Sequence, residues 1–453
     1  APPVAGDGVK VGTFLGNYGR RYYGQGPAPN RLDVIWKVRL GSGWSSGKYD
    51  DDPPSKWAGS GWTGQPNIVV DGGKTYVIAS SYEYKLRKID AETGKVVWAY
   101  QYDDIIKGSP TVFQNPSPAG RDDKYIVVAG SRRGYPYKLD DPRVAPVRAV
   151  TFGTGKELWR LPVPQTDCYS RDSDGSGFFF DGVYYLGVES GWFYALDPLK
   201  TNEWAEGNKP VVEAQRLLLG DQRAAGHDGN LVLESSASAI GKTLYVASGA
   251  GHVYGLRRPD LKVVWDYYIG SDLDGTPVPT SEGLLLQAVE KEYIKGKGGM
   301  LALDPAKPAA EAAVWYFPTD NRKVGDWAGG VVGSASVNDA YNPDGRYPAL
   351  CAFNAIDGYL YVVARDVMSD ETVPGPDRGP KLPRPVQVAK IWNGGAISTP
   401  ILLGDALVAA GYDQRVHLFN VRYDEAEKGD DGALPSANGD GTYWTVTLEE
   451  RDQ

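Results

Sequence analysis

The chain has 453 residues, a formal net charge of −9 and 11% aromatic residues. An acidic chain without a basic stripe lacks the charge that binding to nucleic-acid phosphates requires, which excludes nucleic acid as a partner. No stretch approaches the ~20 consecutive apolar residues of a membrane-spanning helix. The 57 glycines and 32 prolines favour many short strands joined by turns.

An internal repeat organises most of the chain. Its clearest copy, residues 74–102, has an alternating strand, a second strand that ends at Asp90, a turn at Thr93 and Gly94, and a strand that carries Trp98. Further copies lie at 147–164, 183–200, 243–270, 299–318, 358–367 and 406–424. Each copy follows a short strand, here called an opener, that begins with small or acidic residues. The openers are 61–72, 106–113, 172–182, 227–241, 271–283, 326–339 and 394–405.

Four short antiparallel strands per repeat make the blade of a β-propeller. The sequence therefore predicts an all-β chain that forms a single propeller over residues 31–450, with seven blades, or eight if one is degenerate. Residues 31–40 (RLDVIWKVRL) and 441–450 (GTYWTVTLEE) are expected as terminal strands that close the propeller. Residues 1–30 are expected to form an arm. Loop insertions are predicted at 41–64, 368–385 and 424–441.

The stretch DAETGKVVW, from Asp90 to Trp98, resembles the tryptophan-docking repeat of quinoprotein-like (PQQ-like repeat) β-propellers, and the resemblance spans residues 31 to about 450. In that family, the tryptophan of one blade packs on the turn of the next blade. The resemblance implies this structural role for Trp98, Trp159, Trp265, Trp315, Trp392 and Trp444. The third blade has QRLLL at 215–219 and lacks the tryptophan.

Two branches of this family differ in function. The pyrroloquinoline-quinone dehydrogenases are longer, bind calcium with the quinone and have adjacent cysteines, whereas Cys168 and Cys351 are 183 positions apart. These two cysteines form either one long-range bridge or two separate buried thiols. The other branch resembles the assembly factor BamB and secreted proteins that bind other proteins without catalysis. Length and cysteines favour this second branch and argue against the quinone.

The acidic residues of the openers are the sharpest candidate site. The first strand of each propeller blade lines a central channel, so Asp172, Asp174, Asp228, Glu234, Asp272, Asp274 and Asp326 are expected to gather in one funnel. Clustered carboxylates require a cation, a basic partner or raised pKa values. The alternative is turn chemistry, since Asp-Gly pairs suit tight strand entries. Residues 172–183 do not form an EF-hand, because Val183 occupies its twelfth position. Any metal would bind Asp172, Asp174, Asp272 and Asp274.

These features predict an exported, non-enzymatic scaffold or assembly subunit that binds other proteins, in the periplasm or at the cell surface, with membrane association only through a partner. The start APPVAGDG, without an initiator methionine, favours export. An arm is expected to dock on partners through Tyr18, Arg20, Arg21, Tyr22 and Tyr23. No cofactor is expected. The alternative is a ligand- or calcium-binding propeller, or a quinoprotein-type oxidoreductase that uses the acidic funnel.

Overall fold

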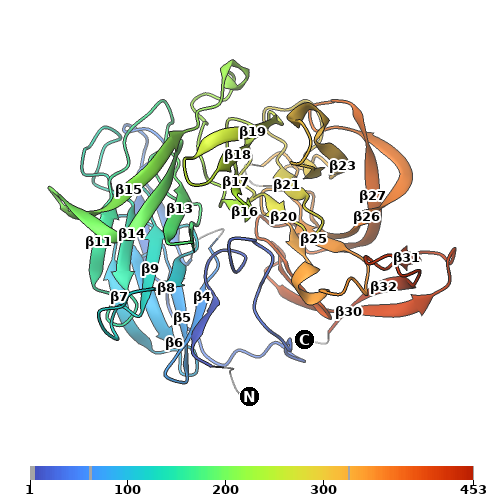
Figure 1. Ribbon diagram of the computed structural model, residues 1–453, viewed down its shortest axis with the longest axis horizontal. Coiled ribbons are helices and arrows are strands. Elements are labelled where there is room, and N and C mark those ends of the chain that lie inside the picture. Colours follow the sequence, from blue (N-terminus) through green and yellow to red (C-terminus); the bar gives the residue numbers. More distant parts are fainter. Residues whose placement is uncertain (1–5, 61–63, 325–326, 452–453) are drawn as a thin grey trace. The chain divides into compact units, whose positions relative to one another are not determined.

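The computed structural model describes residues 6–60, 64–324 and 327–451. Almost all regular structure in these residues is β, with 32 strands and three short 3-10 helices (Figure 1). The chain divides into two compact units. The first comprises residues 1–20, 34–250 and 256–264, and the second comprises residues 21–33, 251–255 and 265–453.

Three antiparallel sheets lie within the first unit, and in each the strands named next to one another are hydrogen-bonded neighbours. The first contains β1 (Gly8–Val11), β4 (Asn67–Asp71), β5 (Lys74–Ser80), β6 (Lys85–Asp90) and β7 (Val96–Gln101). The second contains β11 (Glu157–Leu161), β10 (Val147–Thr151), β9 (Tyr125–Gly130) and β8 (Thr111–Gln114). The third contains β12 (Phe178–Phe180), β13 (Val183–Gly187), β14 (Trp192–Trp204) and β15 (Gly207–Leu217). A separate hairpin pairs β2 (Ser42–Ser45) with β3 (Ser55–Ala58), and η1 (Gln222–Ala224) is a 3-10 turn.

The fourth sheet includes residues of both units and contains β16 (Ser238–Ile240), β17 (Thr243–Ala247), β18 (His252–Arg257) and β19 (Lys262–Tyr268).

Three further sheets belong to the second unit. The fifth contains β20 (Val278–Pro279), β21 (Leu285–Val289), β22 (Gly299–Leu303) and β23 (Ala313–Pro318). The sixth contains β24 (Ser336–Val337), β25 (Leu350–Asn354), β26 (Tyr359–Pro374) and β27 (Lys381–Trp392). The seventh contains β28 (Ile401–Leu403), β29 (Ala406–Ala410), β30 (Val416–Ala426), β32 (Tyr443–Glu450) and β31 (Leu434–Pro435). The other 3-10 turns are η2 (Ala309–Glu311) and η3 (Asp339–Tyr341).

The predicted all-β fold with four-stranded antiparallel blades is confirmed. Among the described residues, the seven sheets with four or five strands fit the seven expected blades. Each predicted opener covers all or most of the first strand of its repeat, from β4 in the first sheet to β28 in the seventh. The core lies between neighbouring sheets. In the first unit, Phe113 and Trp159 of the second sheet belong to one buried cluster with Tyr184 and Tyr194 of the third.

The prediction of a strand at 31–40 is wrong, because these residues have no strand partner among the described residues. Another N-terminal strand was not expected: β1 lies within the predicted arm and pairs with β4. At the other end, the expected outer strand in 441–450 is present as β32, which pairs with β30.

The prediction of a loop at 368–385 is also wrong. Strands β26 and β27 continue their pairing through this segment as a long ribbon, up to Pro374 opposite Lys381 (Figure 1). Pro383 and Pro385 lie on β27, the edge strand of its sheet, where proline is tolerated because one side of the strand needs no ladder hydrogen bonds. Part of 41–64 likewise forms the β2–β3 hairpin, and part of 424–441 belongs to β30 and β31.

Candidate functional site

Three consecutive openers of the first unit contact one another through small residues. Lys107, Asp174 and Glu234 precede β8, β12 and β16, and each is followed by two small residues, in the order GS, GS and SS. A Cβ atom on Gly108 would lie 2.0 Å from the carbonyl oxygen of Asp174. Only glycine permits that approach.

Serine hydroxyls join the same openers. The backbone N–H of Ser176 donates to Oγ of Ser236 at 2.8 Å, and Oγ of Ser176 donates to the carbonyl of Ser109 at 2.9 Å. The residues that precede these serines are therefore brought to one place, which explains why the first unit gathers charged side chains there.

The gathered side chains form a buried carboxylate cluster, defined here as Asp174, Glu189 and Glu234. One carboxylate oxygen from each lies within 4.8 Å of the others. The Lys107 ammonium contacts Asp174, and its Nζ lies 4.0 Å from Oε1 of Glu234. Glu189 is only 1% exposed, and its Oε1 has no hydrogen-bond partner among the described residues. The cluster thus holds three acids against one lysine.

Burial and mutual repulsion perturb the ionisation of this cluster. Burial, reinforced by Glu234 and Asp172, raises the pKa of Asp174 to about 6 although Lys107 opposes the shift. Burial and the neighbouring Asp174 hold the pKa of Glu189 well above its usual range. Burial disfavours the charged form of Lys107, but the surrounding carboxylates outweigh it and raise the lysine pKa.

A second buried network, around Arg132, lies beside the cluster. Arg132 Nε donates to Oδ2 of Asp172 at 2.6 Å. Burial opposes the ionisation of Asp172, yet Arg132 and Lys107 outweigh it and lower the pKa of that carboxyl. Asp104 accepts a hydrogen bond from Oγ of Ser45 at 2.7 Å, and burial raises the pKa of Asp104 to about 6 against the opposing charge of Arg132.

The structure brings together only part of the predicted acidic set. Asp174 and Glu234 are in the cluster, and Asp172 lies beside it in ion-pair contact with Arg132. Asp228 is exposed in a tight turn with φ of 48°. Asp272 and Asp274 belong to the second unit and are half-buried. Asp326 lies outside the described residues.

Sequence reasoning missed Lys107, Glu189 and Arg132. A signal existed for Lys107, because it holds the same repeat position in its opener as Asp174 and Glu234 hold in theirs. Glu189 follows β13 and Arg132 follows β9, which are the second strands of their repeats. The search for acidic residues was confined to the first strands, so it could not find either residue.

Three of the six candidate docking tryptophans donate their indole N–H to a backbone carbonyl of the following sheet or its turns. The acceptors are Phe152 for Trp98 at 2.9 Å, Pro198 for Trp159 at 2.9 Å and Lys307 for Trp265 at 3.1 Å. All six tryptophans lie on the strand next to the third strand of the repeat. This is the edge strand of its sheet except in the seventh sheet, where β31 lies outside β32.

The other three have different surroundings. Trp315 is buried, and its Nε1 finds no hydrogen-bond partner in the part of the chain that the structure describes. Trp392 is 49% exposed and packs against Tyr359 of its own sheet, and Trp444 donates to Oγ of Ser436 at 3.1 Å.

The predicted docking arm packs against its own chain. Arg20 is fully buried and donates to the carbonyls of Ala237 and Ser176, both at 2.8 Å. Tyr18 makes an edge contact with Phe180. The expectation that Arg20 docks on partners is therefore corrected, because the chain's own carbonyls already occupy its donors.

The remaining arm residues contact the second unit's own side chains. Tyr22 and Tyr23 stack on Tyr341, and the buried hydroxyl of Tyr23 accepts a hydrogen bond from the N–H of Val337 at 2.9 Å. Arg21 is half-exposed, and its guanidinium lies 3.8 Å from Asp339. Tyr23 is thus also unavailable to a partner.

The cysteines are two separate thiols. Cys168 and Cys351 are both free and buried, and burial raises the pKa of each thiol to about 12. The bridged alternative is therefore excluded. The described residues contain no helix with the length and apolar character needed to cross a membrane.

Known proteins support the predicted repeat. The family model described as outer membrane protein assembly factor BamB, a PQQ-like repeat model, matches residues 33–208, which confirms that this part of the chain carries the repeat. Among curated proteins, none matches the sequence.

Several solved structures are similar at low identity. BamB from Moraxella catarrhalis is 13% identical, with a TM-score of 0.47 over 85% of this chain and 92% of that chain. A europium-containing methanol dehydrogenase is 11% identical, with a TM-score of 0.49 over 91% and 90%. U3-55K is 12% identical, with a TM-score of 0.44 over 82% and 90%.

Proposed function

We propose that this protein is an exported, non-enzymatic scaffold that binds other proteins, alone or as a subunit of a larger assembly. The observation that carries the proposal is that two edge strands expose apolar side chains. Strands β7 and β19 each end a sheet, and Val97 on β7 and Val264 on β19 are 49% and 50% exposed. An unpaired edge with exposed apolar side chains is a surface that a second chain can cover.

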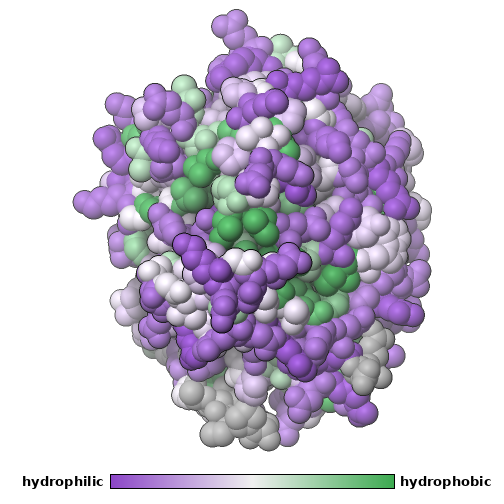
Figure 2. Space-filling model, turned by 90° about the vertical axis from the view of Figure 1, so that its right-hand side faces the viewer, coloured by the Kyte–Doolittle hydropathy of each residue, from purple (hydrophilic) through white to green (hydrophobic). Residues whose placement is uncertain are grey.

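Two further observations support a binding role. The family model that matches residues 33–208 is named for an assembly factor, a protein that works on other proteins. Figure 2 shows one face of the chain on which apolar side chains lie exposed in small patches among hydrophilic ones. Such patches suit contacts with a protein surface better than with a small solute.

The scaffold proposal is tested by binding between purified proteins. Cross-linking in the native cell envelope identifies candidate partners, and each candidate is then purified and mixed with the chain. We expect sedimentation velocity to show a stoichiometric complex with at least one candidate. Aspartate at both Val97 and Val264 is expected to weaken it at least tenfold, because charge is costly in an apolar contact.

The matched control places aspartate at Gln101 and Lys262, which are exposed polar residues of the same two strands. This control is expected to retain binding. Failure of every purified candidate to form a complex contradicts the scaffold function.

A second candidate function, binding of a divalent cation such as calcium, is favoured by one observation. Oε1 of the buried Glu189 lies in the carboxylate cluster and has no hydrogen-bond partner within residues 6–60, 64–324 and 327–451. Carboxylate oxygens are the ligands that calcium prefers, so the donor set fits. A cation entering the cluster displaces the Lys107 ammonium from Asp174, which lowers the affinity expected for the site.

Calorimetric titration of chelator-treated protein with calcium chloride tests this function. We expect one site per chain whose affinity falls at least tenfold in Glu189→Gln, because the amide keeps the shape and removes the charge. Asp228→Asn, which changes an exposed acid outside the cluster, is expected to leave the affinity unchanged. Absence of binding, or equal binding by Glu189→Gln, overturns the calcium function.

A further inference from the structure

Trp36 contacts the first sheet in the way that Trp98 contacts the second. The indole Nε1 of Trp36 donates to the carbonyl of Ala91 at 2.8 Å, and a Cβ atom on Gly94 would lie 2.8 Å from the ring. Trp98 donates to the carbonyl of Phe152 at 2.9 Å, and a Cβ atom on Gly155 would lie 2.9 Å from its ring. Acceptor and glycine have the same spacing in both turns.

The two tryptophans differ in what surrounds their backbone. Trp98 lies on β7, the fourth strand of the repeat, and β7 pairs with the third strand β6. Trp36 lies in residues 34–40, here called the Trp36 segment, whose backbone makes no hydrogen bond with the described residues. Trp36 therefore contacts the turn as the tryptophan of a fourth strand does, but the described part of the chain places no third strand beside it.

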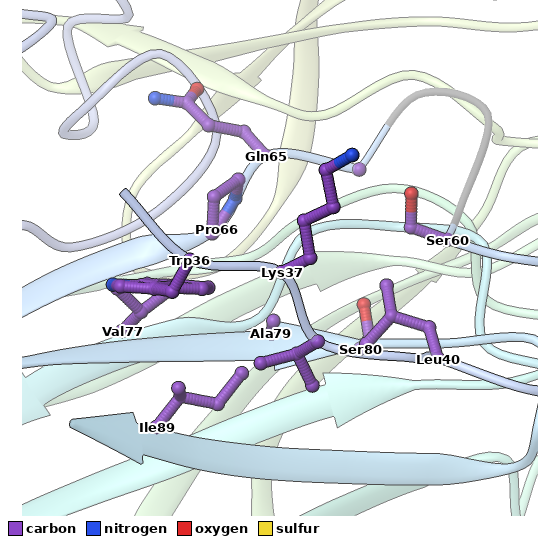
Figure 3. Close-up of a pocket in the computed structure, with 12 residues that line it drawn as sticks. Trp36, Lys37, Leu40, Ser60, Gln65, Pro66, Val77, Ala79, Ser80 and Ile89 are labelled. Atoms are coloured by element: carbon purple, nitrogen blue, oxygen red, sulfur yellow. The ribbon is translucent and has the colours of Figure 1, made fainter. Parts of the chain in front are cut away.

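The side chains of the Trp36 segment alternate as in a strand. Trp36, Val38 and Leu40 are half-buried, whereas Lys37 and Arg39 are exposed. The half-buried three line a cavity of about 460 Å³ over the first sheet, with Val77 and Ile89 beneath it (Figure 3). Figure 3 shows Lys37 pointing away from these strands. Period-two alternation with extended backbone is the geometry that accepts a neighbouring strand.

The start of the Trp36 segment is the most exposed apolar pair in the described chain. Val34 and Ile35 are 71% and 80% exposed, more than any other large apolar residue in the described ranges. Two adjacent aliphatic side chains in an extended segment with unpaired backbone form a typical site for strand addition.

We infer that the Trp36 segment is the docking edge for an extended strand of a partner protein, which takes the place of the missing third strand. The inference rests on the proposed scaffold function and identifies where a partner binds. Opposite residues of paired strands share a face, so the partner strand should carry acidic residues opposite Lys37 and Arg39 and apolar residues between them.

Charge argues against a second copy of this chain as the occupant. Antiparallel pairing of two Trp36 segments about Val38 would set Lys37 of one copy opposite Arg39 of the other, and like charges directly opposite are destabilising. An acidic, alternating strand avoids this repulsion. It also satisfies backbone N–H and C=O groups that the described chain leaves unpaired.

Fluorescence anisotropy with labelled nonapeptides tests the inference. The probe alternates valine and glutamate, a second peptide alternates valine and lysine, and a third is the probe with N-methylated backbone amides along one edge. We expect the probe to bind the full chain at least tenfold more tightly than either of the others. Equal binding of the methylated peptide would overturn strand pairing, because it lacks the required donors.

Charge reversal locates the edge. The double variant Lys37→Glu/Arg39→Glu is expected to prefer the valine–lysine peptide, whereas Lys95→Glu/Lys262→Glu, with the same change in net charge at two exposed lysines, should keep the original preference. An unchanged preference in the first variant, or a dimer of the chain that this variant dissolves, overturns the inference.

If a purified partner still binds the first variant, only the docking edge is wrong. If the probe binds but no protein partner does, the scaffold function is wrong.

Discussion

Replacement of Arg20 by alanine is expected to lower the free energy of unfolding by about 3 kcal/mol. The guanidinium is fully buried and donates to the carbonyls of Ala237 and Ser176, and also to Phe14 at 2.6 Å. Alanine would leave these carbonyls without their donors. Phe14 follows β1, whereas Ser176 precedes β12 and Ala237 precedes β16, so one side chain joins three segments that are distant in sequence.

The adjacent arginine provides the control. Arg21 is half-exposed and its nearest carboxylate oxygen, on Asp339, lies 3.8 Å away, so Arg21→Ala is expected to cost less than about 1 kcal/mol. Guanidinium chloride unfolding followed by tryptophan fluorescence measures both variants. Similar losses for Arg20→Ala and Arg21→Ala would show that the buried hydrogen bonds of Arg20 do not hold these segments together.

Most strands were predictable because their signals are local. The copy that carries Trp98 has alternating apolar residues, a Thr93-Gly94 turn and a second strand that ends at Asp90, and all of these lie within about 30 residues of sequence. In the structure, Asp90 Oδ1 accepts hydrogen bonds from the N–H and Oγ1 of Thr93 at 2.9 Å, so the turn is formed by residues that the sequence places next to each other.

Residues 31–40 were predicted wrongly because a strand also requires a partner. Their alternation resembles that of β7, and Trp36 even makes the expected turn contact. Pairing, however, depends on whether a third strand is present beside the segment, and the alternation of a segment carries no information about its neighbour. The same limit explains Arg20, whose burial depends on carbonyls more than 150 residues away.

Two of the three acids of the candidate site were predictable from sequence, but the third acid and the lysine that balances them were not. Asp174 and Glu234 stand at opener positions that repeat, which is a sequence signal. Glu189 enters from the end of β13, and the ammonium of Lys107 enters from a neighbouring opener. Which of these charges meet depends on the packing of consecutive sheets through Gly108 and the serines, and that packing is set by three-dimensional contacts.

Replacement of Lys107 by methionine is expected to be the most destabilising single change at neutral pH, at about 4 kcal/mol. Methionine preserves the length of the side chain but removes the only ammonium that contacts the carboxylate cluster among the described residues. Asp174, Glu189 and Glu234 would then repel one another in a buried site. Arg132 remains paired with Asp172, so its positive charge balances the neighbouring network and not the carboxylate cluster.

The loss of stability in Lys107→Met should be larger at pH 7.5 than at pH 5. The pKa of Asp174 is raised to about 6 from its usual 3.8, so the folded chain holds a proton that the unfolded chain releases. The stability contributed by that proton is present below pH 3.8 and is lost as the pH rises through 6. Without Lys107, the pKa of Asp174 should rise further. The variant should therefore be far less stable than the parent at pH 7.5 and closer to it at pH 5.

Unfolding of both proteins at pH 5 and pH 7.5 measures this difference. Lys200→Met is the control, because Lys200 also pairs with an aspartate, Asp197, but its side chain is 74% exposed. Solvent screens such a pair, so this variant should be close to the parent in stability at either pH. A loss in Lys107→Met that is equal at both pH values would mean that the lysine acts through packing. A loss that narrows at pH 5 would show that its charge holds the openers of three consecutive sheets together.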